Sequence, residues 1–195
     1  MKKTVSAALL GLALSGCVSF GAKPPPFLLN LSAASHVAAD DARSAAAGNA
    51  ITISVPVAPA AIATNRVAVT DGATAVAYVK DAAWVEPPAR LFQRLVSETV
   101  AAKTGRVVLD PRQFALDPGT VVTGTLKSFG IDARRAEAAI VYDAALSTDG
   151  GANVRTRRFE ARVPVGGEIE AASAGRALNS AANKVAEDVA GWIAG

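Results

Sequence analysis

The stretch Ala138-Ala139-Ile140-Val141-Tyr142-Asp143-Ala144-Ala145-Leu146 decides the fold of this chain. Its larger apolar residues alternate with smaller or polar ones, which is the period of a β-strand with one buried face. A second strand is expected before it, from Thr120 to Ile131, and a third follows the turn predicted at Asp149-Gly150-Gly151. Three strands joined in sequence by short turns predict an antiparallel meander. The inner face of the third strand is expected to carry Phe159, Ala161, Val163 and Val165.

The strand that opens this meander contains an irregularity. Its apolar phase shifts between Leu126 and Phe129. Such a shift indicates one extra residue in the strand, so we predict a β-bulge near Lys127.

Two helices are predicted to cover the sheet. The first opens at Pro87-Pro88, because proline is favoured in the first turn of a helix, and it ends at Gly105. The second runs from about Ile169 to Ile193. Its apolar stripe at helical spacing is formed by Ala174, Ala177, Leu178, Ala181, Val185, Val189 and Trp192.

The N-terminal half supplies further strands. Asp71-Gly72 lies between two β-rich runs and predicts a hairpin. The alternating residues from Ile51 to Val57 predict a strand that lies at a sheet edge or ends at Pro56 and Pro59. Short strands are expected at 27–31 and 107–109, and a loop at 32–49. The sequence therefore predicts an α+β domain over residues 27–195, with a single mostly antiparallel sheet and two main helices packed on one face.

The N-terminus has the layout of a secretory signal peptide over residues 1–16. Lys2 and Lys3 precede a short apolar run, and the run ends in Leu14-Ser15-Gly16-Cys17. This ending resembles the bacterial lipobox, in which the cysteine is acylated and becomes the first residue. A lone cysteine can also be a buried small hydrophobe or a free thiol, but its position directly behind this run favours lipidation.

Residues 17–26 are then a lipidated cysteine and a proline-rich tether. Pro24-Pro25-Pro26 favours an extended polyproline II spacer. An aspartate after the cysteine would resemble an inner-membrane retention signal, whereas this chain has Val18. We therefore expect a lipid-anchored protein of the outer membrane that faces the periplasm. The apolar run of the signal peptide is too short to span a bilayer, and no stretch beyond it is long enough for a transmembrane helix.

Composition excludes several functional classes. The formal net charge is +3, and two of the lysines belong to the signal peptide, so we expect no nucleic-acid partner. With one cysteine no intramolecular disulfide can form. The only histidine, His36, would be needed for a histidine–nucleophile pair, but it lies in a polar loop rich in alanine and serine, which is typical of a solvated side chain. Metal ligands are lacking, Asp40-Asp41 is typical of a solvated turn, and no phosphate-binding fingerprint is present. We therefore expect no catalytic residues, no metal and no cofactor.

A group of arginines has two interpretations. Arg134, Arg135, Arg155, Arg157 and Arg158 would form one basic cluster if the meander pairs as predicted. They are either ordinary charged positions on the outer faces and turns of a sheet or a site for an anionic lipid headgroup or an acidic partner.

The segment from Tyr78 to Pro88 also has two interpretations. Trp84 precedes the proline-started helix in a chain with few aromatic residues. It either packs the helix against the sheet, which is the interpretation we favour, or anchors a partner, since tryptophan is enriched in interface hot spots. If Trp84 is core, the exposed neighbours Glu86 and Arg90 are the candidates for partner binding.

These motifs together resemble a known family. The lipobox, Phe27-Leu28-Leu29, and the run from Asn65-Arg66 through Tyr78 to Trp84-Val85-Glu86-Pro87-Pro88 are similar to the ABC-type transport auxiliary lipoprotein family, which includes the paraquat-inducible type C lipoprotein. The Phe129 strand and the helix ending in Trp192-Ile193 also fit. The family often has a tyrosine where this chain has Phe27.

The resemblance implies a non-catalytic auxiliary lipoprotein of a mammalian-cell-entry (MCE) type transport system. Its expected partners are an MCE-domain protein, an ABC permease complex, phospholipid, and the membrane through the N-terminal acyl chains. Such systems move lipids or other hydrophobic molecules across the cell envelope. The alternative is a stand-alone structural or assembly lipoprotein that binds another outer-membrane protein.

Overall fold

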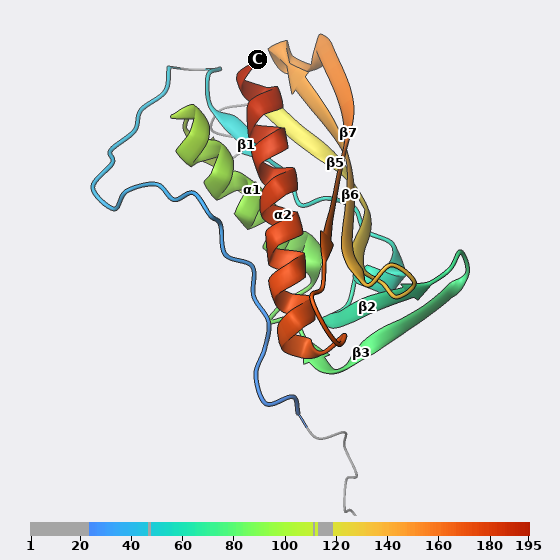
Figure 1. The fold of residues 1–195 in the computed structure, drawn as a ribbon. Helices are drawn as coiled ribbons and strands as arrows, with labels where there is room; N and C mark the ends of the chain where they lie inside the picture. The colour runs from blue at the N-terminus through green and yellow to red at the C-terminus, as the bar shows by residue number, and fades with distance from the viewer. Residues whose placement is uncertain (1–23, 47, 111, 113–118) are drawn as a thin grey trace, which may run out of the picture.

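The computed structural model describes residues 24–46, 48–110, 112 and 119–195. The predicted signal peptide, Cys17 and the tether up to residue 23 lie outside these residues. Within the described residues, seven strands form one mixed sheet, and two α-helices cover one of its faces (Figure 1). The α+β class is confirmed, whereas the prediction of a mostly antiparallel sheet is wrong because three strand pairs are parallel.

The antiparallel meander is the largest part of the sheet. It consists of β5 (Thr120–Asp132), β6 (Glu137–Thr148) and β7 (Asn153–Pro164). The register of β5 against β6 shifts between Leu126 and Ser128, which confirms the predicted bulge. A 3-10 turn, η3 (Asp149–Gly151), joins β6 to β7.

The parallel strands lie along the other side of β5. β1 (Ile51–Ile53) pairs with its first residues and β2 (Arg66–Asp71) with its last ones. Between them, the 3-10 helix η1 (Ala60–Ile62) and a single bridge from Val57 to Thr125 follow the same side. β1 is not at the sheet edge, because β4 (Val108–Leu109) pairs with it on its far side; it does end before Pro56. The predicted hairpin is confirmed by the antiparallel pairing of β2 with β3 (Ala75–Ala83).

Both helices begin and end close to the predicted residues. α1 spans Pro88–Thr104, and Gly105 ends it in the left-handed region at φ 69°, with its N–H donated to the Ala101 carbonyl. Glycine favours this cap because it has no side chain to clash there. α2 spans Ala171–Ala194. It begins with a capping box between Glu170 and Ser173, which satisfies amide groups that the first turn leaves free.

The predicted strand at 27–31 is instead an extended segment that lies on α2. Its only strand-like contact in the described chain is a bridge between Leu29 and Trp84. The Asn183 side chain accepts from the Ala34 N–H (2.7 Å) and donates to the Ser32 carbonyl (2.9 Å), and Asn179 accepts from the Ser32 N–H (2.9 Å). Asparagine side chains of the helix thus replace the neighbouring strand that the sequence pattern suggested.

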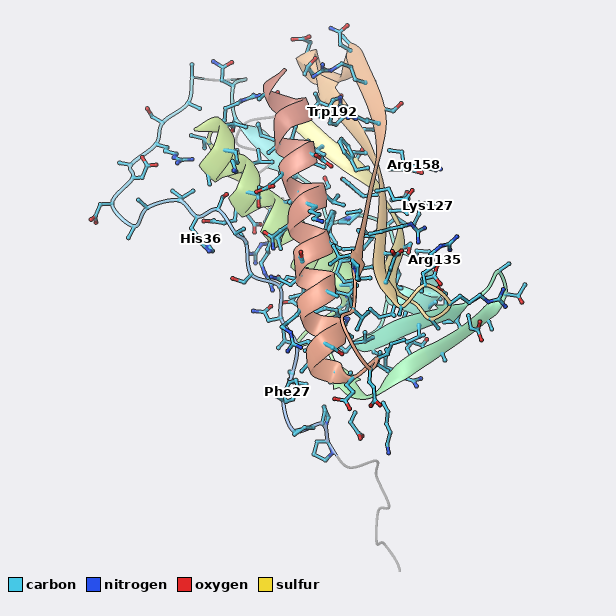
Figure 2. All side chains as sticks on the ribbon, viewed as in Figure 1. Phe27, His36, Lys127, Arg135, Arg158 and Trp192 are labelled. Carbon is cyan, nitrogen blue, oxygen red and sulfur yellow. The ribbon has the colours of Figure 1, made fainter. Side chains whose placement is uncertain are left out.

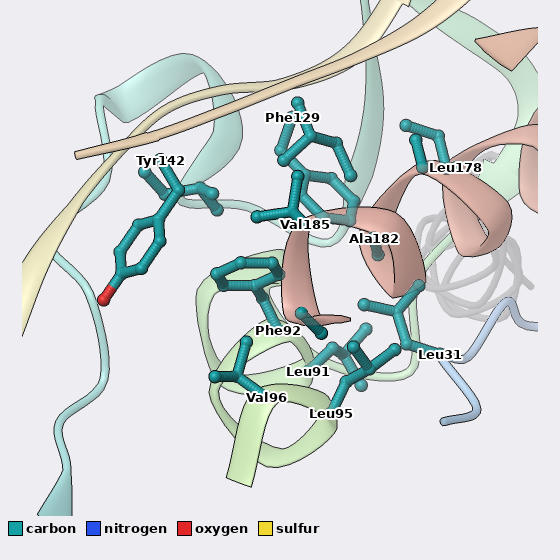
Figure 3. Close-up of a cluster of buried hydrophobic side chains, with 14 of the residues drawn as sticks. Leu31, Leu91, Phe92, Leu95, Val96, Phe129, Tyr142, Leu178, Ala182 and Val185 are labelled. Carbon is teal, nitrogen blue, oxygen red and sulfur yellow. The ribbon is translucent and has the colours of Figure 1, made fainter. Parts of the chain in front are cut away.

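The core fills the space between the helices and the sheet (Figure 3). Phe92 of α1 meets Tyr142 of β6 edge-on at a ring-centroid distance of 5.2 Å and Phe129 of β5 at 6.4 Å. Small residues of α2, among them Ala182, are buried in the same core, where α2 packs against α1 (Figure 3). Phe159 and Ala161 of β7 and Val165 directly after it are buried as predicted, while Val163 is half-buried.

Candidate docking surface

Trp84 belongs to the core. Only 1% of its surface is exposed, and its ring lies 5.6 Å from that of Phe129 at an interplanar angle of 71°. The interpretation of Trp84 as packing between helix and sheet is therefore confirmed. The alternative, a direct partner anchor, is wrong for Trp84 because a buried ring offers a partner no surface.

The backbone on either side of Trp84 is held in place from two directions. The Trp84 N–H donates to the Asn65 carbonyl (2.6 Å), and the Val85 N–H donates to the Leu29 carbonyl (2.9 Å). Leu29 in turn donates its N–H to the Ala83 carbonyl (2.7 Å). Since α1 begins at Pro88, the residues between Trp84 and the helix have little freedom to move.

The fixed backbone presents Glu86 at the start of α1. Its carboxylate forms an ion pair with the Arg94 guanidinium. The hydrogen bond from Arg94 lowers the pKa of Glu86 below its ordinary value of 4.5, and the charge of Arg90 acts in the same direction. Glu86 is thus ionised at neutral pH, and 29% of its side chain remains exposed.

Arg90 carries the charge that remains available. Its side chain is exposed, and it forms no ion pair with any residue in the described part of the chain. Glu86 is already neutralised by Arg94, so the guanidinium of Arg90 is free to meet a carboxylate of another molecule.

Glu86 and Arg90 lie at one end of a surface groove of about 380 Å³. The groove continues along α1 to Gln93 and Arg94 and reaches the chain after β4. Its lining residues are Val55, Glu86, Arg90, Gln93, Arg94, Asp110 and Arg112. Gln93 is fixed by donating to the Ile53 carbonyl at 3.0 Å, so α1 and β1 form a firm floor.

The far end of the groove contains a second ion pair. Arg112 Nε lies 2.9 Å from Asp110 Oδ1, and this hydrogen bond lowers the pKa of Asp110. Three arginines therefore face two carboxylates, and the groove is weakly basic. We name this surface, defined by the seven lining residues, the α1 groove.

Sequence reasoning identified only two residues of the α1 groove. The spacing of Glu86, Arg90 and Arg94 by four residues could have revealed the third, because such residues share a helix face. Asp110 and Arg112 could not be found this way, since they reach the groove only through the parallel pairing of β1 with β4.

The polar residues considered for catalysis or metal binding are not brought together. His36 lies on the exposed loop, with Nδ1 3.7 Å from Glu98 Oε1. Asp41 pairs with Arg43. In the part of the chain that the structure describes, no group of three or more histidine, cysteine, aspartate or glutamate residues is arranged to hold a metal ion.

The predicted single basic cluster is wrong. Arg134 and Arg135 lie in the turn between β5 and β6, where they pair with Asp71 and Asp132. The other three arginines lie near the opposite end of β6, because Arg155 is in register with Leu146. There, Arg158 binds Asp143 through two hydrogen bonds of 2.5 and 2.7 Å. The charged positions mostly neutralise carboxylates of the sheet itself.

Solved structures share this fold. A Xanthomonas campestris protein is 16% identical with a TM-score of 0.65, and the match covers 86% of this chain and 94% of that one. The structure of an uncharacterised protein is 13% identical, also with a TM-score of 0.65, over 86% of this chain and 96% of its own. A search of curated proteins finds no match.

The family follows from the sequence. This chain belongs to the family of ABC-type transport auxiliary lipoprotein components, whose sequence model matches residues 29–190. That description makes it a lipid-anchored protein of the cell envelope that accompanies an ABC transport system, and it names no enzymatic activity. Within the described residues, no helix combines the length and the apolar character needed to cross a bilayer.

Proposed function

We propose that this protein is the non-catalytic auxiliary lipoprotein of an MCE-type ABC transport system that moves lipids or other hydrophobic molecules across the cell envelope. Acyl chains on Cys17 would anchor it to the outer membrane with its folded domain in the periplasm. Family membership supports the association with an ABC transporter. The lipobox-like ending supports the anchor.

The α1 groove is the proposed contact with the MCE-domain protein or the permease. The observation that carries this proposal is the unpaired guanidinium of Arg90, held beside a neutralised Glu86 on a rigid helix start. Rigid surfaces lose little conformational entropy on binding, so a docking site here would retain most of its interaction energy. A partner with an acidic side chain would complement Arg90.

The test is affinity purification of the full chain from detergent-extracted envelopes, with mass spectrometry of the co-purifying proteins. We expect recovery of an MCE-domain protein or its permease, and we expect the Glu86→Ala/Arg90→Ala double variant to lose it. The matched control is Glu160→Ala/Arg162→Ala, which removes an exposed ion pair on β7 far from the groove. Unchanged recovery in the first variant would remove the α1 groove as the docking site. Recovery of an outer-membrane barrel in place of transport components would instead support the stand-alone assembly role.

A further inference from the structure

The face of the sheet away from the helices contains a small apolar pocket. Its volume is about 200 Å³. Ala139, at its floor, alternates along β6 with the core residues Ala138 and Ile140, and therefore points to the opposite face of the sheet. The lining residues are Pro59, Ala61, Ile62, Ala68, Thr70, Val76, Lys127, Ser128, Phe129, Gly130 and Ala139.

The pocket is built by the register of three strands. Ala68 of β2 is paired with Gly130 of β5, and Gly130 is paired with Ala139 of β6. Three of the smallest residues thus stand side by side across the sheet, where larger side chains would fill the space. η1 crosses above this row and forms a wall with Ile62, which is only 6% exposed.

A single cation stands at the rim. The bulge between Leu126 and Ser128 places Lys127 among the lining residues. Its side chain is exposed and lies on the side of the sheet away from α2 (Figure 2). Lys127 forms no direct ion pair with any residue for which the structure gives a position: the nearby Asp143 is paired with Arg158, and the charge of Lys127 only adds to the lowering of the Asp143 pKa.

We propose that this pocket binds the apolar end of an acyl chain whose anionic headgroup meets Lys127. An apolar cavity of about 150 Å³ accepts a molecule of the size of benzene, so this pocket can hold the last few carbons of a chain but not a whole phospholipid. A fatty acid carboxylate and a lysophospholipid phosphate share the required chemistry. Among the described residues no carboxylate binds the ammonium of Lys127 directly, since Asp143 is paired with Arg158, and this favours an anionic amphiphile over a purely apolar group.

The inference goes beyond the proposed docking function, because it assigns a direct lipid contact to the auxiliary protein itself. The two are also independent in space, since the α1 groove and this pocket share no lining residue. A test without any partner protein can therefore fail or succeed regardless of docking.

The probe is a photoactivatable diazirine analogue of octanoate, added to the full chain in nanodiscs of zwitterionic lipid. Crosslinked peptides are identified by mass spectrometry. We expect saturable labelling on the segments around Ala61 and Gly130, and we expect competition by unlabelled fatty acids to strengthen by about fourfold per added methylene until the pocket is full. Scattered labelling without saturation would overturn the proposal.

Two variants test the pocket itself. Ala139→Leu fills the floor of the pocket and should reduce labelling at least about tenfold, because several methylenes of the bound acyl chain can no longer be buried there. Ala145→Leu is the matched control, since it makes the same change on the same face of β6 outside the pocket. Should Ala139→Leu melt at a much lower temperature than the wild type, Ala61→Phe fills the pocket from η1 instead. Undiminished labelling in a folded filling variant would contradict the site.

Further competitors test the headgroup and its source. Lys127→Gln should weaken competition by octanoate about two- to fivefold, the range of one exposed charge pair, and leave octanol unaffected. Lys80→Gln, an exposed lysine outside the pocket, is the control. Octanoate is then compared with octanoyl lysophosphatidic acid. Stronger competition by octanoate indicates a free fatty acid as the source of the acyl chain, and stronger competition by octanoyl lysophosphatidic acid indicates a phospholipid. If neither competes, the pocket does not bind acyl chains, and an apolar side chain of a partner protein becomes its occupant.

Discussion

The ring of Trp84 meets the ring of Phe129 edge-on, with 5.6 Å between the two ring centroids. This contact joins the segment before α1 to β5, which pairs with three other strands of the sheet. Aromatic pairs in this geometry contribute beyond the area they bury. The Trp84 contact therefore couples the start of the helix to the middle of the sheet.

Replacement of Trp84 should destabilise the whole domain. Trp84→Ala removes a fully buried ring and leaves a cavity, so we expect a loss of about 3–5 kcal/mol in the free energy of unfolding. Denaturant titration followed by circular dichroism measures it. Trp192→Ala is the control, because this second tryptophan is only partly buried and should cost less. A Trp84→Ala protein as stable as the wild type would contradict the core assignment.

Asn183 should control the order of the N-terminal segment. Asn183→Ala removes the acceptor of the Ala34 N–H and the donor to the Ser32 carbonyl. Each such hydrogen bond contributes about 1 kcal/mol, and we expect faster amide hydrogen exchange at Ala34 with little change in the sheet. Asn183→Asp keeps the acceptor and should leave Ala34 protected. Equal exchange rates in all three proteins would show that the segment is held by other contacts.

The ion pair between Glu86 and Arg94 should give a pH-dependent contribution to stability. Arg94 lowers the pKa of folded Glu86 below 4.5, so the pair stabilises the protein above that pH and loses this effect as the pH falls through the folded-state pKa. Glu86→Gln should therefore be slightly less stable than the wild type at pH 7, by less than about 1 kcal/mol, and this difference should be smaller at pH 3. Paired denaturant titrations at the two pH values measure the difference. A gap of the same size at both would refute the pKa assignment.

Gly124 makes room for Tyr142. A β-carbon at Gly124 would lie 2.3 Å from the Asp143 carbonyl oxygen and 2.6 Å from Tyr142 Cε2. Gly124→Ala should thus cost about 1–3 kcal/mol through overpacking. Gly191→Ala in α2 is the matched control: apart from its chain neighbours and the nearby backbone of its own helix, no described atom lies within 4 Å of the added carbon, so it should gain about 0.5–1 kcal/mol of stability. Thermal melting of the two variants should shift in opposite directions, and a shift in the same direction would contradict this geometry.

Cys17 should be the membrane anchor. Cys17→Ala cannot be acylated, and we expect an uncleaved precursor or a form that leaves the membrane fraction. Three acyl chains would otherwise hold the protein firmly, since each buried methylene contributes about 0.8 kcal/mol. Intact mass spectrometry and membrane fractionation measure both effects. A mature wild-type protein without acyl groups would rule out the lipid anchor.

The antiparallel parts of the fold were predictable because their signals are local. Asp71-Gly72 and Asp149-Gly150-Gly151 mark turns between neighbouring strands, and the phase shift around Lys127 revealed the bulge. The parallel pairs leave no such mark. β1 and β2 meet β5 across a long stretch of intervening chain, and no turn sequence connects them.

The α1 groove was predictable only in those parts that depend on residues close together in the sequence. The position of Trp84 directly before a proline-started helix favoured its burial, and Arg90 was then expected among the exposed residues at the helix start. The ion pair of Glu86 with Arg94 joins two residues near the start of the same helix, but it was not predicted from the sequence. By contrast, the apolar pocket depends on the alignment of Ala68, Gly130 and Ala139 across three strands, which only the tertiary structure reveals.

The attachment of the N-terminal segment to α2 also limits how the protein can stand on a bilayer. Phe27 lies beside the first residues of α2 and the end of β3, with Glu170 and Lys80 in the same depression. With Cys17 as the proposed anchor, the twelve residues back from Leu29 reach at most about 40 Å. The chain would then approach the membrane from the N-terminal end of α2. With that end facing the bilayer, the helix, roughly 36 Å long at about 1.5 Å per residue, would hold the β6–β7 turn at its opposite end away from the membrane surface (Figure 1).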